Sequence, residues 1–189
     1  MAYLDGIYFN LKQEHKIESR SVSIVLGVNL EGHKEVLGHW VSDSAESASF
    51  WLKVVTDLKN RGVQDIFIAC IEGLSGFKEA FRAVFPHAEI QRWIVHQIRN
   101  SLKYVVWADR KAFAADLRQV YQAPTREAGE TALLALSEKW GDKYAMAGRC
   151  WENNWNDLAT FFTYTPEIRR LLYTTNPIEG YNRQLRNAT

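Results

Sequence analysis

Cysteine is nearly absent from this sequence. Its two cysteines, Cys70 and Cys150, lie far apart and show none of the spacings that bind metal. We therefore expect no disulfide framework and interpret the chain as a cytoplasmic protein of a reducing compartment. Cys70 lies in an apolar run, which predicts a small buried side chain.

An excess of charge and a long apolar run are also missing. The 23 Lys and Arg residues face 22 Asp and Glu residues, and the resulting net charge of +1 argues neither for nor against a nucleic-acid partner. Binding to nucleic acid would have to be indicated by a local patch of basic residues. No signal-peptide pattern opens the chain and no apolar stretch is long enough to span a bilayer, so we expect no membrane contact.

Apolar and aromatic residues are plentiful, at 47% and 13% of the 189 residues. This length and composition predict one domain, or one domain with an insertion, around a substantial core. The chain opens in strand-like residues by Tyr3 and ends within a helical pattern, so we expect it to be a fragment of a longer protein.

Strand patterns fill the first half of the chain. Between the third and fourth strands an apolar stripe predicts a helix over 47–58 with Ser44 as its N-cap. Three consecutive strands, a helix and a fourth strand parallel to the first indicate a mixed sheet. The predicted strands cover 3–11, 21–30, 35–41, 65–71 and 89–95, with a charged turn over 12–20 and a short helix over 77–85.

Helical spacing dominates the second half, so the predicted fold class is α/β. The predicted helices cover 96–107, 109–122, 125–140, 151–164 and 177–188, with Pro124, Gly141 and Pro166 between them. We expect their large side chains to form a packed seam, with the tryptophans in the core rather than serving as base-stacking platforms. The seam residues are Phe113, Leu117, Trp140, Trp151, Trp155, Phe161 and Phe162.

Three acidic residues stand where a strand ends or a helix begins. Asp5 lies in the first strand, Glu72 directly follows the fourth, and Glu179 lies in the first turn of the last predicted helix. Carboxylates from separate elements can hold two divalent metals, which stabilise the attacking and the leaving oxygen of a phosphodiester. The structural alternatives are a solvated strand acid for Asp5, a turn residue for Glu72 and a favourable helix-terminal charge for Glu179.

Short motifs resemble bacterial insertion-sequence transposases of the mutator family, in that family's order and over nearly the whole chain. The matching stretches are 3–8 (YLDGIY), 27–29 (GVN), 37–38 (LG), 46–47 (ES), 50–51 (FW), 58–62 (LKNRG), 73–77 (GLSGF), 85–86 (FP), 91–92 (QR), 95–100 (VHQIRN) and 174–179 (TTNPIE).

This resemblance implies a ribonuclease H-like fold with a helical insertion before the last acid. The core would be 1–96, the insertion 97–165, and the returning helix 166–189. It also implies a DDE triad of Asp5, Glu72 and Glu179 that uses Mg²⁺ or Mn²⁺ to cut DNA at transposon ends and join it to target DNA. We also expect a homodimer or higher assembly on DNA.

The sequence departs from the family pattern at two positions near this chemistry. The family's second acid is Asp, whereas Glu72 carries its carboxylate one methylene further out, and errors of ~1 Å can cost ~10²-fold in rate. The family's Cys or Asp three residues before His96 is Trp93. We therefore predict that His96 orders the edge of the active site or contacts a phosphate, and does not bind metal.

The family's amino-terminal DNA-binding region also has no counterpart in the chain. Two alternatives to an active transposase follow. One is an inactive remnant that binds DNA or pairs with full-length subunits, and the other is a general metal-dependent nuclease of the same fold.

Basic and amide side chains near these motifs are candidate contacts to DNA phosphates, because Arg matches phosphate geometry. The alternative is an ordinary solvated charged face. The candidates are Arg92, His96, Arg99, Lys103, Asn176, Asn182, Arg183 and Arg186.

Overall fold

The computed structural model describes residues 1–13, 16–42, 47–71 and 76–173, with the side chains of all of these except 7–13 and 16–19. The chain divides into two compact units, with the division between Ile90 and Gln91. The first unit carries most of the sheet and the second is helical.

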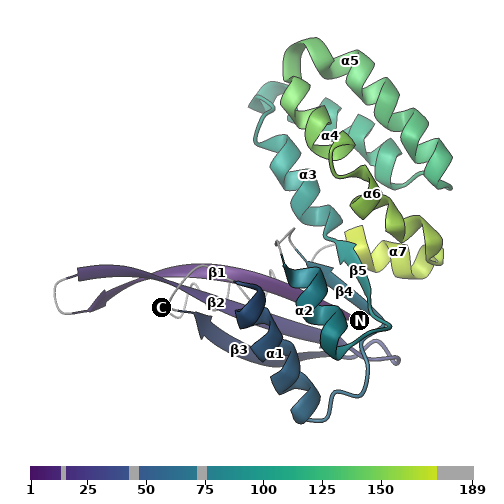
Figure 1. Cartoon of the computed structure of the whole chain (residues 1–189). Coiled ribbons are helices and arrows are strands. Elements are labelled where there is room, and N and C mark those ends of the chain that lie inside the picture. The colour runs from purple at the N-terminus through teal and green to yellow at the C-terminus, as the bar shows by residue number, and fades with distance from the viewer. Residues whose placement is uncertain (14–15, 43–46, 72–75, 174–189) are drawn as a thin grey trace. The chain divides into compact units, whose positions relative to one another are not determined.

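A five-stranded mixed sheet is the centre of the first unit (Figure 1). Its order is β3-β2-β1-β4-β5, so β1 is the middle strand. β1 pairs antiparallel with β2, β2 antiparallel with β3, and β1 parallel with β4. The strands are β1 (Ala2–Gln13), β2 (Lys16–Val28), β3 (Lys34–Ser42), β4 (Ile68–Ile71) and β5 (Glu89–Arg92). These findings confirm the predicted α/β class and the parallel pairing of the first and fourth strands.

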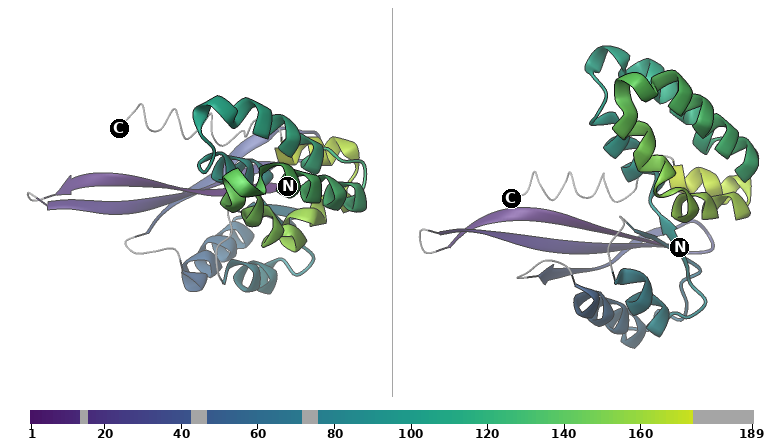
Figure 2. Two further views of the ribbon diagram at one scale, coloured as in Figure 1. Left: turned by 90° about the horizontal axis from the view of Figure 1, so that it is seen from above. Right: turned by 45° about the horizontal axis from the view of Figure 1, so that its top comes forward.

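The charged turn predicted over 12–20 is wrong, because strand covers most of that segment. β1 continues to Gln13 and β2 begins at Lys16, and these two residues are register partners. The pairing is made by backbone groups, so charged residues do not end it. The long ribbon that results is visible in Figure 2.

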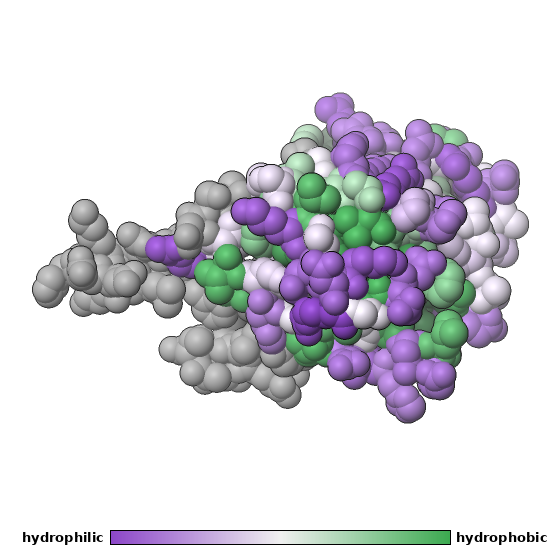
Figure 3. All heavy atoms as spheres, turned by 60° about the horizontal axis from the view of Figure 1, so that its bottom comes forward, coloured by the Kyte–Doolittle hydropathy of each residue, from purple (hydrophilic) through white to green (hydrophobic). Residues whose placement is uncertain are grey.

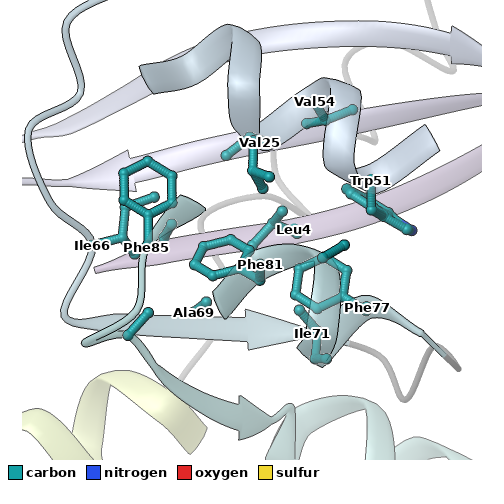
Figure 4. Close-up of a cluster of buried hydrophobic side chains, with 14 of the residues drawn as sticks. Leu4, Val25, Trp51, Val54, Ile66, Ala69, Ile71, Phe77, Phe81 and Phe85 are labelled. Carbon is teal, nitrogen blue, oxygen red and sulfur yellow. The ribbon is translucent and has the colours of Figure 1, made fainter. Parts of the chain in front are cut away.

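Two helices, α1 (Ala48–Asn60) and α2 (Phe77–Val84), cover one face of this sheet (Figure 4). The N-cap of α1 is Ser47, whose side chain accepts a hydrogen bond from the Phe50 amide at 3.2 Å, so the predicted cap at Ser44 is wrong. Leu4 on β1 packs into this core, and alternation along the strand places Tyr3 and Asp5 on the opposite face. The side chains buried between helices and sheet include Val25, Trp51, Val54, Ala69, Ile71, Phe77, Phe81 and Phe85.

The second unit consists of helices packed around the predicted aromatic seam. Most members of the seam are buried, while Trp140 and Phe162 are half-buried. Pro166 occupies the first position of α7, which begins ahead of the helix predicted over 177–188, and at this place its missing amide hydrogen costs nothing. The helices are α3 (Ile94–Leu102), α4 (Trp107–Tyr121), α5 (Arg126–Glu152), α6 (Trp155–Leu158), the 3₁₀ helix η1 (Ala159–Thr163) and α7 (Pro166–Tyr173).

The segment α5 is two helices that fold back on each other at Tyr144, whose φ of −136° and ψ of 47° are not helical. Ser137 Oγ lies 2.5 Å from Glu152 Oε1, whereas a straight helix would separate residues this far apart in sequence by about 22 Å. The sequence predicted that the helix would end at Gly141, close to the observed fold. Asp109 on α4 fixes the bend, since its Oδ2 accepts hydrogen bonds from Lys143 Nζ and Tyr144 OH.

The surface combines a hydrophilic cover with smaller apolar areas, as Figure 3 shows for one face. Among the described residues, no helix is both long enough and apolar enough to cross a membrane.

Candidate functional site

Asp5 is a buried acid on the middle strand of the sheet, with 8% of its surface exposed. Its register partner on β2 is Ile24, which is fully buried. Removing a carboxylate from water is costly, so proteins place one in such surroundings only with compensating interactions or for a chemical purpose. The structural alternative of a solvated strand acid is therefore wrong for Asp5.

The parallel pairing of β1 with β4 brings the chain close to the second predicted acid. Ala2 pairs with Ala69 and Tyr3 pairs with Cys70. Asp5 stands two residues after Tyr3 in sequence, and Glu72 stands two residues after Cys70. Glu72 lies outside the described residues, and the register of this pair of strands is known only up to Tyr3 and Cys70.

The third predicted acid, Glu179, also lies outside the described residues, and so do Asn176, Asn182, Arg183 and Arg186. Within the described part of the chain, no group of three or more His, Cys, Asp or Glu side chains is arranged to hold a metal ion. The convergence of the three carboxylates accordingly remains a prediction.

The strand predicted over 89–95 ends at Arg92, and the chain turns into α3 at Ile94. Trp93 occupies the N-cap position of α3 and is 1% exposed. Its ring stacks on the ring of His96, with centroids 4.5 Å apart and planes 23° apart. Trp93 is thus a core residue that offers no oxygen or sulfur ligand, and the half-buried His96 is ordered by packing against it.

Two buried glutamines near this turn were missed as positioning residues. Gln91 donates from Nε2 to the Leu158 carbonyl at 3.0 Å and accepts from Thr160 Oγ1 at 2.7 Å. Gln97 donates from Nε2 to the Cys150 carbonyl at 2.7 Å. Little in the sequence distinguishes them, since Gln91 precedes Arg92 and Gln97 follows His96, and a buried amide is recognised by its partners from other elements.

A serine on α3 extends this polar network into the aromatic seam. Trp151 Nε1 donates to Ser101 Oγ at 2.7 Å, and Ser101 Oγ donates in turn to the Gln97 carbonyl at 3.0 Å. The Cys150 thiol lies 3.1 Å from the same hydroxyl, and burial raises the pKa of this thiol above the ordinary value. The network fixes α3 against α5 and so fixes the direction in which α3 presents its other faces.

Both cysteines are free thiols, as the sequence predicted. Cys70 is fully buried in β4, and this burial raises the pKa of its thiol well above its usual range. Burial raises the pKa of the neighbouring Tyr3 hydroxyl in the same way. Neither group is therefore ionised near neutral pH, and Cys70 is an inert packing residue.

The basic candidates on α3 share one face of the helix. His96, Arg99 and Lys103 follow each other at intervals of three and four residues, and Arg99 and Lys103 are exposed. Arg92 is half-buried at the end of β5. This placement suits phosphate contacts and suits a solvated charged face equally well.

The turn after α3 exposes aromatic side chains that sequence reasoning did not single out. Trp107 is 84% exposed and Tyr104 is 51% exposed. Arg110 lies over the Trp107 ring, with its guanidinium carbon 5.8 Å from the ring centroid. A tryptophan in a helical pattern usually faces a core, so only the structure reveals this exposure.

The family model described as Transposase, Mutator family matches residues 1–189. The transposase for insertion sequence element ISRM3 of Rhizobium meliloti (strain 1021) is 43% identical over 189 residues, which cover 100% of this chain and 47% of that protein. A probable transposase for an insertion sequence element of Corynebacterium diphtheriae is 41% identical over 188 residues, covering 99% of this chain and 54% of that protein. The chain therefore spans about half the length of these curated relatives, and it belongs to the mutator family of transposases.

Proposed function

We propose that the chain is the catalytic domain of a DDE transposase that cleaves DNA at the ends of an insertion sequence and transfers the freed strand to target DNA. The observation that carries this proposal is the position of Asp5. It is buried on the middle strand of the sheet, next to a parallel strand that leads directly into Glu72. An acid in the core of a sheet is explained by chemistry more readily than by stability.

The sheet supports the ribonuclease H-like assignment. Three successive antiparallel strands are followed by a helix and by a strand that pairs in parallel with the first. The catalytic acids of such a fold would come from β1, from the segment after β4 and from a late helix. Asp5, Glu72 and Glu179 occupy those positions in the sequence.

Asp5 is the member of the triad that lies within the described residues. Its side chain fits a divalent metal, because a carboxylate oxygen is the ligand that Mg²⁺ and Mn²⁺ prefer. Asp5, Glu72 and Glu179 would hold the ions. Bound there, two metals would stabilise negative charge on the attacking and leaving oxygens of the phosphodiester. The buried position of Asp5 restricts its rotamers, which keeps the carboxylate in one place for that task.

DNA is the proposed substrate and partner. Arg99 and Lys103 are exposed on the same face of α3 as His96, where they would contact phosphates and fix the register of the duplex. Such contacts are independent of sequence and weaken as salt rises.

Asp5→Asn tests the proposal directly, in the chain and in a full-length protein that contains it. With the element's own ends and with Mg²⁺ or Mn²⁺, the change should lower cleavage by more than about 100-fold, since loss of supporting contacts alone costs 10–100-fold in metal sites. Asp65→Asn is the matched control, because Asp65 is exposed and accepts a hydrogen bond from the Ile66 amide that Asn can also accept.

The outcomes separate the three candidate functions. If cleavage persists in Asp5→Asn, Asp5 is not a catalytic metal ligand. Absence of cleavage in the unaltered full-length protein, with DNA binding intact, identifies an inactive remnant. Cleavage that ignores the sequence of the ends identifies a general nuclease.

A further inference from the structure

An exposed aromatic and basic turn joins α3 to α4 in the helical unit. Trp107 is 84% exposed, whereas the other six tryptophans of the chain are buried or half-buried. Tyr104 and Val106 beside it are 51% and 56% exposed. Leaving a tryptophan in water forgoes a large burial free energy, and a cluster of such side chains is typical of an interaction surface.

The charge around this turn is positive. Residues 99–111 contain four basic side chains and one acid, Asp109. The carboxylate of Asp109 accepts hydrogen bonds from Lys143 and Tyr144, which hold its pKa below the ordinary value. Lys103 and Lys111 are exposed on either side of Trp107. A partner with negative charge and flat apolar groups therefore fits this surface.

The turn is held by hydrogen bonds that fix the ring's surroundings. The Tyr104 amide donates to the Ser101 carbonyl at 3.1 Å, and the Val105 amide donates to the Leu102 carbonyl at 3.3 Å. Arg110 donates from Nε to the Val105 carbonyl at 3.0 Å, which places its guanidinium over the Trp107 ring. A rigid support lowers the entropy lost when a partner binds.

We infer that Trp107 and Tyr104 form a stacking platform for unpaired DNA bases, with Lys103, Arg110 and Lys111 holding the adjoining phosphates. This inference rests on the proposed function, and it extends the predicted phosphate contact of Lys103 into a region that stacks bases. Flat aromatic rings among basic side chains are the usual means of binding single strands, because every base has a face that can stack. A second copy of this chain is the less favoured occupant, since two such positive surfaces would repel each other.

The test measures the affinity of the chain for fluorescently labelled single-stranded DNA, a duplex with an unpaired tail and a blunt duplex. The unaltered chain should prefer the two DNAs with unpaired bases. Trp107→Ala should weaken single-strand binding at least fivefold, and Trp107→Phe should restore part of the loss, because one stacked base contributes about 1–3 kcal/mol. Leu134→Ala is the control, since Leu134 is 65% exposed on α5 in the same unit.

Two further readouts identify the contacts. Lys103→Ala and Lys111→Ala should each reduce the salt dependence of single-strand binding by about 0.7 in the slope of log affinity against log salt. Single strands that carry 5-bromouracil should crosslink under light to the peptide containing Trp107.

Several results would overturn the inference. The first is that the chain binds none of the DNAs measurably. The second is that Leu134→Ala and Trp107→Ala weaken single-strand binding equally. The third is that Trp107→Ala loses self-association while its DNA affinity is unchanged. Asp5→Asn separates the inference from the proposed function, because it should abolish cleavage and leave binding intact. If the chain cleaves DNA and Trp107→Ala leaves single-strand binding unchanged, only the inference is wrong. If Trp107→Ala weakens binding but no metal-dependent cleavage occurs, only the proposed function is wrong.

Discussion

Alanine at Gly129 and alanine at Gly141 should change stability in opposite directions, although both glycines lie in α5. Neither residue has a positive φ, so an alanine side chain strains neither backbone. In a helix the exchange alone should stabilise the fold by about 0.5–1 kcal/mol, because alanine loses less conformational freedom on folding. At Gly141 no atom outside the neighbouring residues and the helix's own backbone lies within 4 Å of the added methyl group, so this gain should appear in full.

At Gly129 the new methyl carbon would lie 2.7 Å from Phe162 Cζ and 3.0 Å from Trp155 Cη2. Neither ring can move away cheaply. Trp155 donates a hydrogen bond to Glu130 at 2.8 Å, and Phe162 stacks on Phe161 with ring centroids 4.2 Å apart. Overpacking of a core costs about 1–3 kcal/mol, so subtracting the helix gain leaves a net loss of up to about 2.5 kcal/mol.

Urea unfolding followed by far-ultraviolet circular dichroism measures both variants, and thermal unfolding provides a second measure. In a unit of this size a change of 1 kcal/mol shifts Tm by about 4–8 °C. A Gly129→Ala chain as stable as the unaltered one would refute the close packing of Phe162 and Trp155 on α5. A destabilised Gly141→Ala chain would refute the open space beside that residue.

Three further predictions concern the core, the second acid and the response to acid. Trp155→Ala should cost about 3–5 kcal/mol, because Trp155 is 8% exposed, and unfolding in denaturant with an unchanged midpoint would contradict this. Glu72→Asp should raise metal-dependent cleavage, and Mn²⁺ should support cleavage by the unaltered chain better than Mg²⁺. Equal or lower cleavage by the variant in both metals would show that the longer side chain of Glu72 does not impair metal binding. Hydrogen bonds from Lys143 and Tyr144 lower the pKa of Asp109 below 3.8, so their stabilising effect is present above that pH and lost as pH falls through the folded value. Denaturation curves of Asp109→Asn should therefore approach those of the unaltered chain in acid, and a constant difference from pH 7 down to pH 2 would refute the role of this pair.

Much of the fold could be predicted because local pattern and final structure agree. The apolar runs predicted the strands and the α1 stripe, and the spacing of Phe113 and Leu117 predicted a buried helix face that the structure confirms. The errors arose where tertiary contacts decide. Asp109 on another helix holds the fold at Tyr144, and backbone pairing carries β1 and β2 through charged residues.

The candidate site was predicted from the sequence to a smaller extent. The strand position of Asp5 followed from its apolar neighbours, and the rarity of aspartate within strands favoured a chemical role for it. The burial of Asp5 depends on residues brought together from separate strands and cannot be read from periodicity. The stack of Trp93 on His96 is local, but the strand predicted over 89–95 concealed it, because Trp93 is in fact the N-cap of α3. The exposure of Trp107 contradicts its own pattern, and a local rule that fails in this way is typical of functional surfaces.

The middle position of β1 has a consequence for how the protein tolerates fluctuations. Amides of a strand bonded to neighbours on both sides exchange with solvent mainly when the whole cooperative unit opens, whereas helix ends and surface turns open locally and often. The backbone of β1 at Ala2 and Tyr3, which pairs with both neighbours just before Asp5, should accordingly be among the slowest-exchanging segments in hydrogen–deuterium exchange. Local opening elsewhere in the chain would leave this carboxylate anchored. If the proposed function holds, mutations that weaken the sheet would lower the fraction of molecules able to react rather than the rate of each one.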